Sequence, residues 1–376
     1  MKISAVINAI ESYAPRAFQE KWDNSGVQIA LPPDTDECTG VLLCLDVNEA
    51  IVAEAKQRGC NLIVSHHPLI FKGFKSLTGA TVQERAALEA IRAGIAVYSA
   101  HTSLDSTRGG ISYEMASLLG AEVTDVLEPA ENIESVISVI CPRDKADDVR
   151  MVLFNADAGA PLCADNASVP APVENTASCV SNPCESEELP ATPSNDFTLD
   201  ITHRALCRVE TTLPSWRVAA AIASLKEIPG IDKLSYTVQR APVGNAIGLG
   251  VFACYEQPVS GYEFVERLRA AFGCKAIKAS AAYNRDMKIR RIALCGGAGG
   301  EFIGRAIRAG VDAYVTGDIR YHDFADVAEA ACAVFDVGHF ESEQCAKSIF
   351  YRVITKKIPN FAVYYAESET NPVKYV

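Results

Sequence analysis

The chain has 376 residues, of which 49% are hydrophobic, and its 47 acidic and 35 basic side chains give a net charge of −12. This length suffices for about two domains with a large core, and the acidic balance, without any long Lys/Arg run, excludes nucleic acid as the expected main partner. No run reaches the roughly 20 apolar residues of a membrane helix. The first residues indicate an amphipathic helix that meets Pro15, not a signal peptide. The thirteen cysteines form no CxxC pair, so we expect a soluble, cytoplasmic protein with mostly buried thiols.

Strands and helices alternate in the first third of the chain. The expected strands are Val41–Leu45, Leu62–Ser65 and Ile95–Ser99, and the expected helices between them run from about Asn48 to Gly59 and from Thr81 to Ala93. This order predicts an α/β fold with a mostly parallel sheet, whose ligands gather at the carboxyl ends of the strands.

The middle of the chain differs in composition. We expect residues 131–243 to form a smaller α+β domain inserted into a main domain of residues 1–130 and 244–376, with a flexible stretch over 156–193 that is rich in Ala, Pro, Ser and Asn. The expected elements of the insert are strands Val136–Cys141, Phe197–Ile201, Cys207–Thr211 and Lys233–Val238, and helices Lys145–Phe154 and Ser215–Leu225.

The main-domain pattern returns after residue 244. The expected strands are Ile247–Phe252, Arg291–Cys295 and Ala333–Val337, and the expected helices are Gly261–Phe272, Glu301–Ala309 and Glu341–Arg352. Ile91–Tyr98 and Ile307–Tyr314 share a helix end, a glycine and a strand start, which indicates two similar half-sheets, although a chance match over eight residues is equally open. The loop Gly296–Gly300 is either a plain tight turn or a cradle of backbone N–H groups for a phosphate.

Histidines and carboxylates stand at these strand ends. The candidate donors are His66, His67, Asp105, His339 and Glu343. Taken singly, a His-His pair is more often a satisfied core feature, and a His and Glu four apart on a helix more often a solvated face. Three imidazoles and two carboxylates are too few for two separate coordination shells, but they suit two ions about 3.5–4 Å apart that share a carboxylate. We therefore expect two divalent metal ions per chain, with zinc, iron and manganese all open.

Two further histidines are candidates for catalysis. His101 either bonds the backbone or supports a ligand, and His322 is either a proton carrier or a surface residue; we expect supporting or catalytic roles for both. Asp46, at a strand end, is a candidate to orient a ligand, and the turn Asp23–Gly26 either orients ligands or only joins elements. His203, in the insert, is expected to be structural.

Five segments together resemble a known family, the GTP cyclohydrolase 1 type 2 homologues, also called NIF-three-like dinuclear-metal-centre proteins. These segments are Trp22–Gln28, Ser65–Pro68, Ala100–Asp105, Thr316–His322 and Gly338–Glu343. The resemblance implies His66, His67, Asp105, His339 and Glu343 as metal ligands and a ring-shaped homohexamer. It also implies that residues 131–243 form a domain similar to the PII and CutA folds, which are ferredoxin-like. Here the Ala/Pro/Ser-rich stretch replaces an ordered, Gly-rich and Cys-containing segment of the family.

Three possible functions follow from these observations. The first is a metal-dependent hydrolase acting on a nucleotide or related small molecule, with GTP suggested by the family name alone and His322 or His101 moving protons. The second is a non-catalytic metal-binding or regulatory hexamer whose insert senses a small molecule. A third is an interaction protein that works through the insert.

Overall fold

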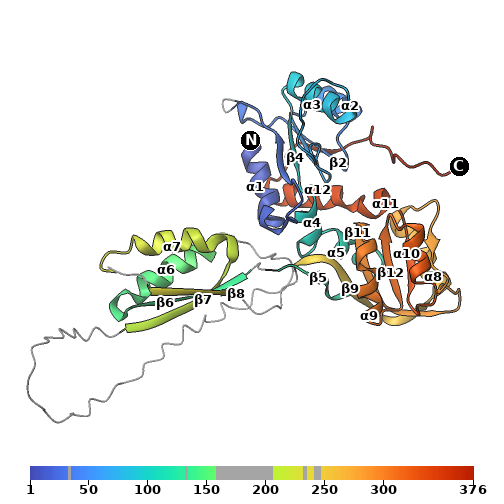
Figure 1. The fold of residues 1–376 in the computed structure, drawn as a ribbon. Helices are drawn as coiled ribbons and strands as arrows, with labels where there is room; N and C mark the ends of the chain where they lie inside the picture. Colours follow the sequence, from blue (N-terminus) through green and yellow to red (C-terminus); the bar gives the residue numbers. More distant parts are fainter. Residues whose placement is uncertain (33–34, 132–133, 158–205, 232–234, 241–246) are drawn as a thin grey trace, which may run out of the picture. The chain divides into compact units, whose positions relative to one another are not determined.

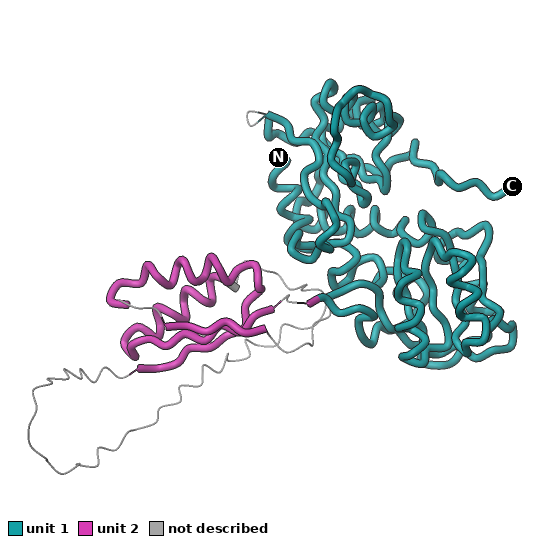
Figure 2. The backbone as a smooth tube through the Cα atoms, in the orientation of Figure 1, with its two compact units in different colours: residues 1–130, 244–376 teal, residues 131–243 magenta. Residues whose placement is uncertain are grey.

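The computed structural model describes residues 1–32, 35–131, 134–157, 206–231, 235–240 and 247–376. They form two compact units, a main unit of residues 1–130 and 244–376 and an insert of residues 131–243 (Figure 2). The two flanks of the chain thus fold together. Across the described residues, no helix has the length and apolar content needed to cross a bilayer.

The first sheet of the main unit has five strands in the order β1-β4-β3-β2-β14. They are β1 (Gly26–Ile29), β2 (Val41–Cys44), β3 (Leu62–Ser65), β4 (Ala96–Ser99) and β14 (Val363–Tyr365). β14, β2, β3 and β4 are parallel, and β1 pairs with β4 in antiparallel fashion. Every residue of β2, β3 and β4 is buried, as expected of parallel strands covered on both faces. The three strands predicted here are confirmed, whereas β1 and β14 were not foreseen.

The second sheet has six strands in the order β10-β13-β12-β11-β9-β5. They are β5 (Glu122–Pro129), β9 (Gly248–Ser260), β10 (Lys278–Ala279), β11 (Lys288–Ala298), β12 (Ala313–Gly317) and β13 (Ala333–Asp336). β11, β12 and β13 are parallel, but β5, β9 and β10 pair with their neighbours in antiparallel fashion. The prediction of a mostly parallel half-sheet therefore fits the first sheet, and the second sheet is mixed.

The helices of the main unit are α1 (Ile3–Tyr13), α2 (Glu49–Gln57), α3 (Val82–Ala93), α4 (Thr102–Ser106), α5 (Ile111–Leu118), α8 (Gly261–Phe272), α9 (Ile303–Arg308), α10 (Tyr321–Asp326), α11 (His339–Glu343) and α12 (Cys345–Lys357). Local sequence signals mark the ends of α2, α3 and α8. Short 3-10 turns lie at Arg16–Phe18 and Gly300–Phe302. The side chains of Asn48, Thr81 and Ser260 accept hydrogen bonds from the first turns of α2, α3 and α8. Gly94 and Gly273 end α3 and α8 in the left-handed conformation.

One apolar core joins the two sheets. Leu43 and Val64 of the first sheet belong to the same cluster of buried side chains as Ile292 and Leu294 of the second. α12 contacts β2 and α5, while α11 contacts β11 and β12, so these two helices run between the sheets (Figure 1). The predicted single helix over Glu341–Arg352 is therefore two helices, α11 and α12.

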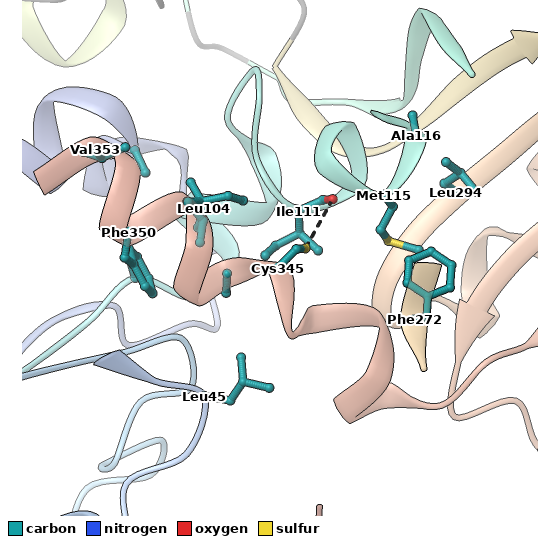
Figure 3. Close-up of a cluster of buried hydrophobic side chains, with 14 of the residues drawn as sticks. Leu45, Leu104, Ile111, Met115, Ala116, Phe272, Leu294, Cys345, Phe350 and Val353 are labelled. Carbon is teal, nitrogen blue, oxygen red and sulfur yellow. Dashed lines mark hydrogen bonds between the residues drawn. The ribbon is translucent and has the colours of Figure 1, made fainter. Parts of the chain in front are cut away.

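The packing between the sheets is continuous from one side to the other. Leu45 lies on the side of the first sheet, Phe350 and Cys345 project from α12, and Met115 and Leu294 lie on the side of the second sheet (Figure 3). Because well-packed cores resist deformation, this shared core fixes the two strand-end edges relative to each other.

In the described residues, the insert has a three-stranded antiparallel sheet in the order β7-β6-β8 and two helices. Its elements are β6 (Glu134–Pro142), α6 (Ala146–Asp157), β7 (Leu206–Pro214), α7 (Val218–Lys226) and β8 (Ser235–Arg240), with 3-10 turns at Arg143–Lys145 and Ser215–Arg217. α6 contacts β6, β7 and α7, and Ile137, Val149 and Leu225 are fully buried in the insert's own core. The predicted strand Phe197–Ile201, His203 and residues 158–193 of the predicted flexible stretch lie outside the described residues.

Candidate metal centre

The histidines and carboxylates singled out from the sequence follow strand ends of both sheets in the main unit. His66 and His67 come directly after β3, His101 comes shortly after β4, α4 carries Asp105, and α11 begins at His339 and ends at Glu343. The parallel pairing of β3 with β4 and of β12 with β13 places these segments at the carboxyl ends of the strands. Three groups of donor atoms result, each with all its atoms within 4.8 Å of one another: His66, Asp105 and Glu343; His67, His339 and Glu343; and His66, His67 and His101.

The His66 ring is fully buried, and its two nitrogens have different surroundings. Nδ1 lies 2.9 Å from the carbonyl oxygen of Ala100. Since a carbonyl only accepts, Nδ1 carries a proton, and in the neutral ring Nε2 presents a lone pair. Nε2 faces Asp105 Oδ1 and Glu343 Oε1, each at 3.6 Å.

Two of these facing atoms make no hydrogen bond. His66 Nε2 and Asp105 Oδ1 are both buried without a partner. Buried polar atoms without a hydrogen-bond partner are unfavourable in a protein interior. A cation among them removes the conflict, and imidazole with carboxylate is a donor set that suits zinc, iron or manganese.

The second group shares Glu343 with the first. Glu343 Oε2 lies 2.8 Å from His67 Nε2 and 3.1 Å from His339 Nε2, and the two histidine nitrogens are 3.3 Å apart. Glu343 thus directs Oε1 at His66 and Oε2 at the other two rings. One carboxylate that serves two adjacent groups is the arrangement expected for a bridging ligand between two ions.

Three aspartates hold the outer nitrogens of the three half-buried rings. Asp46 Oδ1 lies 2.9 Å from His67 Nδ1, Asp318 Oδ2 lies 2.8 Å from His339 Nδ1, and Asp23 Oδ1 lies 2.9 Å from His101 Nδ1. Such carboxylate–histidine pairs fix the tautomer and turn Nε2 towards a metal. The sequence suggested this role for Asp46 and left it open for Asp23. Asp318 stands in one of the family-like segments, but the sequence assigned it no role of its own; in the structure its backbone has a positive φ of 54°.

The histidine pKa values reflect these bonds. Burial on its own would lower the pKa of His67, but hydrogen bonds to Asp46 and Glu343 outweigh burial and raise the pKa to about 10. Burial is likewise outweighed at His339, where the bond to Glu343 and then that to Asp318 raise the pKa to about 9. Without metal, both rings are therefore protonated on both nitrogens, and positively charged, at neutral pH.

The pKa values of the two carboxyl groups of the site, Asp105 and Glu343, shift in opposite directions. Burial raises the pKa of Asp105 to about 7, against the attraction of His66. Burial also opposes ionisation of Glu343, but His66, His339 and His67 together hold its pKa well below the ordinary value. A cation entering the site would displace the histidine protons and ionise Asp105.

The glycine-rich segment makes room for Glu343. Gly297 has φ of +62°, and a Cβ there would lie 2.2 Å from Glu343 Oε1. β11 extends to Ala298, so the predicted loop Gly296–Gly300 is shorter than expected. The N–H groups of Gly296, Gly297 and Gly299 donate to the hydroxyls of Ser112, Ser342 and Thr316. Because protein side chains already occupy these donors, the structure favours a tight turn over a phosphate cradle.

The two predicted proton carriers lie in different surroundings. His101 is in the third donor group, and Asp23 holds its Nδ1, which leaves Nε2 for a proton or a metal. His322 is exposed on α10, and its ring packs edge-to-face against the Tyr321 ring with 5.4 Å between the ring centroids. It is in none of the donor groups found among the described residues. A catalytic role for His322 stays a prediction.

A pocket of about 490 Å³ opens beside the second donor group. Its lining includes His67 and His339, the carboxylates Asp46, Asp318, Asp336 and Glu341, the cation Lys278, and the apolar side chains Phe340, Pro372, Val373 and Tyr375. Asp336 is paired with Lys278 at 2.6 Å. The pocket is large enough for a small molecule and is acidic overall.

The family model described as Duf34/NIF3 (NGG1p interacting factor 3) matches residues 1–372, and the chain belongs to this family. A Mycobacterium tuberculosis protein named "GTP cyclohydrolase 1 type 2 homolog" is 29% identical over 352 residues, which cover 91% of this chain and 88% of the relative. A Bacillus subtilis protein of the same name is 25% identical over 390 residues, with 99% and 98% coverage. The family resemblance expected from the sequence is thereby confirmed.

Solved structures share the fold. The Bacillus cereus protein related to NIF3 superposes with a TM-score of 0.74 at 26% identity and covers 100% of this chain and 99% of its own. Staphylococcus aureus protein SA1388 superposes with a TM-score of 0.76 at 24% identity, with 100% and 99% coverage. The mixed α/β architecture is therefore that of structurally characterised NIF3-related proteins.

Proposed function

We propose that this protein binds two divalent metal ions and uses them to hydrolyse a small molecule. His66, Asp105 and Glu343 would hold one ion, and His67, His339 and Glu343 the other. The observation that carries the proposal is the buried, unpartnered pair His66 Nε2 and Asp105 Oδ1, which faces the shared carboxylate of Glu343. Zinc, iron and manganese all accept such mixed donors.

The side chains around the ions have separate tasks in this proposal. When bound, the ions supply Lewis acidity and make water a stronger acid at neutral pH. Asp46 and Asp318 keep His67 and His339 turned towards the site. His101, fixed by Asp23, is placed to hold or release a proton at Nε2. The pocket beside His67 and His339 admits the substrate.

The substrate class follows from the family and the pocket together. The relatives' name points to GTP, opened at the imidazole ring of the base, as the first compound to test. The pocket lining carries four carboxylates, one lysine and the ligands His67 and His339, and the two divalent ions would offset most of the negative charge. We therefore propose a nucleotide or a related small molecule.

A non-catalytic role is the alternative. In that case the ions stabilise a ring-shaped homohexamer or are stored there, and the insert, proposed as a PII- or CutA-like domain, senses a small molecule. The two roles make different use of the same donors. In the alternative, removal of a ligand collapses the assembly and abolishes no turnover.

The experiment is anaerobic purification with elemental analysis, followed by screening of the metal-loaded protein against nucleosides, nucleotides and phosphoesters. Glu343→Gln and His67→Ala are compared with the wild type and with Glu329→Gln, a change of the same kind at an exposed site. Turnover that disappears in Glu343→Gln and His67→Ala while the assembly persists supports the hydrolase. Absence of turnover from the metal-loaded wild type, with loss of assembly in both variants, supports the structural role.

A further inference from the structure

The C-terminal tail (residues 366–376) runs from the first sheet to the pocket. β14 pairs with β2, and the Ala366 N–H continues this pairing by donating to Leu43 O at 2.9 Å. Glu54 of α2 then accepts hydrogen bonds from the N–H groups of Glu367 and Ser368 at 2.8–3.1 Å. The tail is therefore anchored before it reaches the metal centre.

Glu369 connects the tail to the loop that orients His67. Its side chain is 3% exposed, and one carboxylate oxygen, Oε1, accepts from the N–H groups of Leu45 at 2.5 Å and Asp46 at 3.2 Å. The other oxygen, Oε2, pairs with Lys347 of α12 at 2.5 Å. A buried carboxylate fixed by an ammonium group and two N–H donors is held rigidly. Glu369 therefore fixes the backbone of Asp46, whose side chain holds His67 Nδ1.

The end of the tail reaches the other half of the site. Asn371 Nδ2 donates to Glu341 Oε1 at 2.9 Å, and Glu341 lies on α11 between His339 and Glu343. Residues 371, 372, 373 and 375 line the pocket together with His67 and His339. The tail thus contacts the segments that carry ligands from both sheets.

We infer that the C-terminal tail completes the metal pocket: Glu369 is a positioning residue for the Asp46–His67 pair, and residues 371–373 and 375 form a wall of the pocket that a small molecule must pass. This inference rests on the proposed metal binding. Loss of Glu369 leaves the ligands in place but frees the loop that aims one of them. Loss of residues 371–376 leaves the ligands aimed but the ions open to solvent.

The first experiment is a cobalt titration of the full-length protein, read from the visible absorption of Co²⁺ and from competition with zinc. Glu369→Gln keeps the side-chain shape but places an amide against Lys347, and we expect about tenfold weaker metal binding with an altered cobalt spectrum. Glu367→Gln is the matched control, because that side chain is 81% exposed and pairs with Arg58. Wild-type affinity and spectrum in Glu369→Gln overturn the inference. A wild type that binds no cobalt overturns the proposed function instead.

A double-mutant cycle tests whether Glu369 affects metal binding through Asp46. If Glu369 acts through Asp46, the Glu369→Gln change costs little further affinity in an Asp46→Asn background. Full additivity of the two losses overturns the positioning role.

The pocket wall is tested by a chain that ends after Thr370, which retains Glu369 and so serves also if Glu369→Gln does not fold. We expect wild-type metal content but at least threefold faster transfer of metal to the chelator 4-(2-pyridylazo)resorcinol. An unchanged rate of transfer overturns the wall.

Discussion

His66 Nε2 and Asp105 Oδ1 lie 3.6 Å apart inside the main unit, and neither atom has a hydrogen-bond partner. A buried polar group without a partner costs about 1–3 kcal/mol, so two of them facing each other need an explanation beyond packing. A cation between them provides it. The same cation would be held by Glu343 Oε1, which lies 3.6 Å from His66 Nε2.

Removing the charge of Asp105 should stabilise the metal-free protein. Burial raises the pKa of Asp105 to about 7, above the ordinary 3.8. When the pKa of a carboxyl group is higher in the folded than in the unfolded state, the protein loses stability as the pH rises from the unfolded to the folded pKa, and the loss is complete above pH 7. Chemical denaturation of metal-free Asp105→Asn at pH 8 should therefore give a free energy of unfolding higher than that of wild type by about 1–3 kcal/mol. The difference should vanish near pH 4, and an Asp105→Asn protein less stable at pH 8 would contradict it.

Metal affinity should rise with pH. Without metal, His67 and His339 hold protons because their pKa values are about 10 and about 9, and Asp105 is half protonated near pH 7. A metal must displace these protons, so binding releases them and is weakened as pH falls. Zinc competition titrations at pH 6, 7 and 8 should show steadily tighter binding, and calorimetry in buffers of different ionisation enthalpy should detect the released protons. A pH-independent affinity contradicts this prediction.

Gly297→Ala should abolish metal binding but lower the stability of the metal-free protein only slightly. The new Cβ would lie 2.2 Å from Glu343 Oε1 and push the shared ligand away. Gly273→Ala is the control, because Gly273 has nearly the same φ, +66° against +62°, but nothing within 4 Å of its Cβ. Both variants should lose about 1 kcal/mol from backbone strain, measured by denaturation without metal. Only Gly297→Ala should lose metal in elemental analysis, and equal metal content in the two would refute the space requirement.

Glu54→Gln should loosen the tail in a pH-dependent way. Burial alone would raise the pKa of Glu54, but hydrogen bonds from Ser368 and Glu367 outweigh it and hold the pKa below 4.5. A lowered carboxyl pKa contributes stability above the unfolded pKa of about 4.5 that is lost as pH falls. At pH 7 the variant should be less stable by about 1–2 kcal/mol, with faster proteolysis after residue 366. A difference in stability between Glu54→Gln and the wild type that is the same at pH 3 as at pH 7 would contradict a role for the negative charge of Glu54.

The grouping of the candidate donors could be expected from the sequence because parallel strands deliver their carboxyl ends to one edge of a sheet. His66, His67 and Asp105 each follow a strongly apolar strand, and His339 follows β13 in the same way. Within each sheet their placement therefore follows from the parallel order of the strands, whereas the meeting of the two sheets depends on the shared core. The capping residues Thr81 and Gly94 similarly placed α3 to within a residue.

The roles of two other supporting residues, Asp318 and Glu369, could not be found in this way. Asp318 acts only because β12 lies beside β13, and Glu369 acts across 324 residues of chain on Leu45. β14 has three residues, too few to show a strand period, and its place is set by pairing with β2. Such roles arise from contacts between distant segments, which no local pattern encodes.

The most direct test of the account is the metal stoichiometry of the anaerobically purified full-length protein, measured by elemental analysis after saturation with zinc or manganese. The account predicts about two ions per chain in the wild type and in Glu329→Ala, and loss of both ions in Glu343→Ala, because one carboxylate serves both groups. A wild type that takes up no ion or one ion, or a Glu343→Ala variant that keeps two, would contradict it.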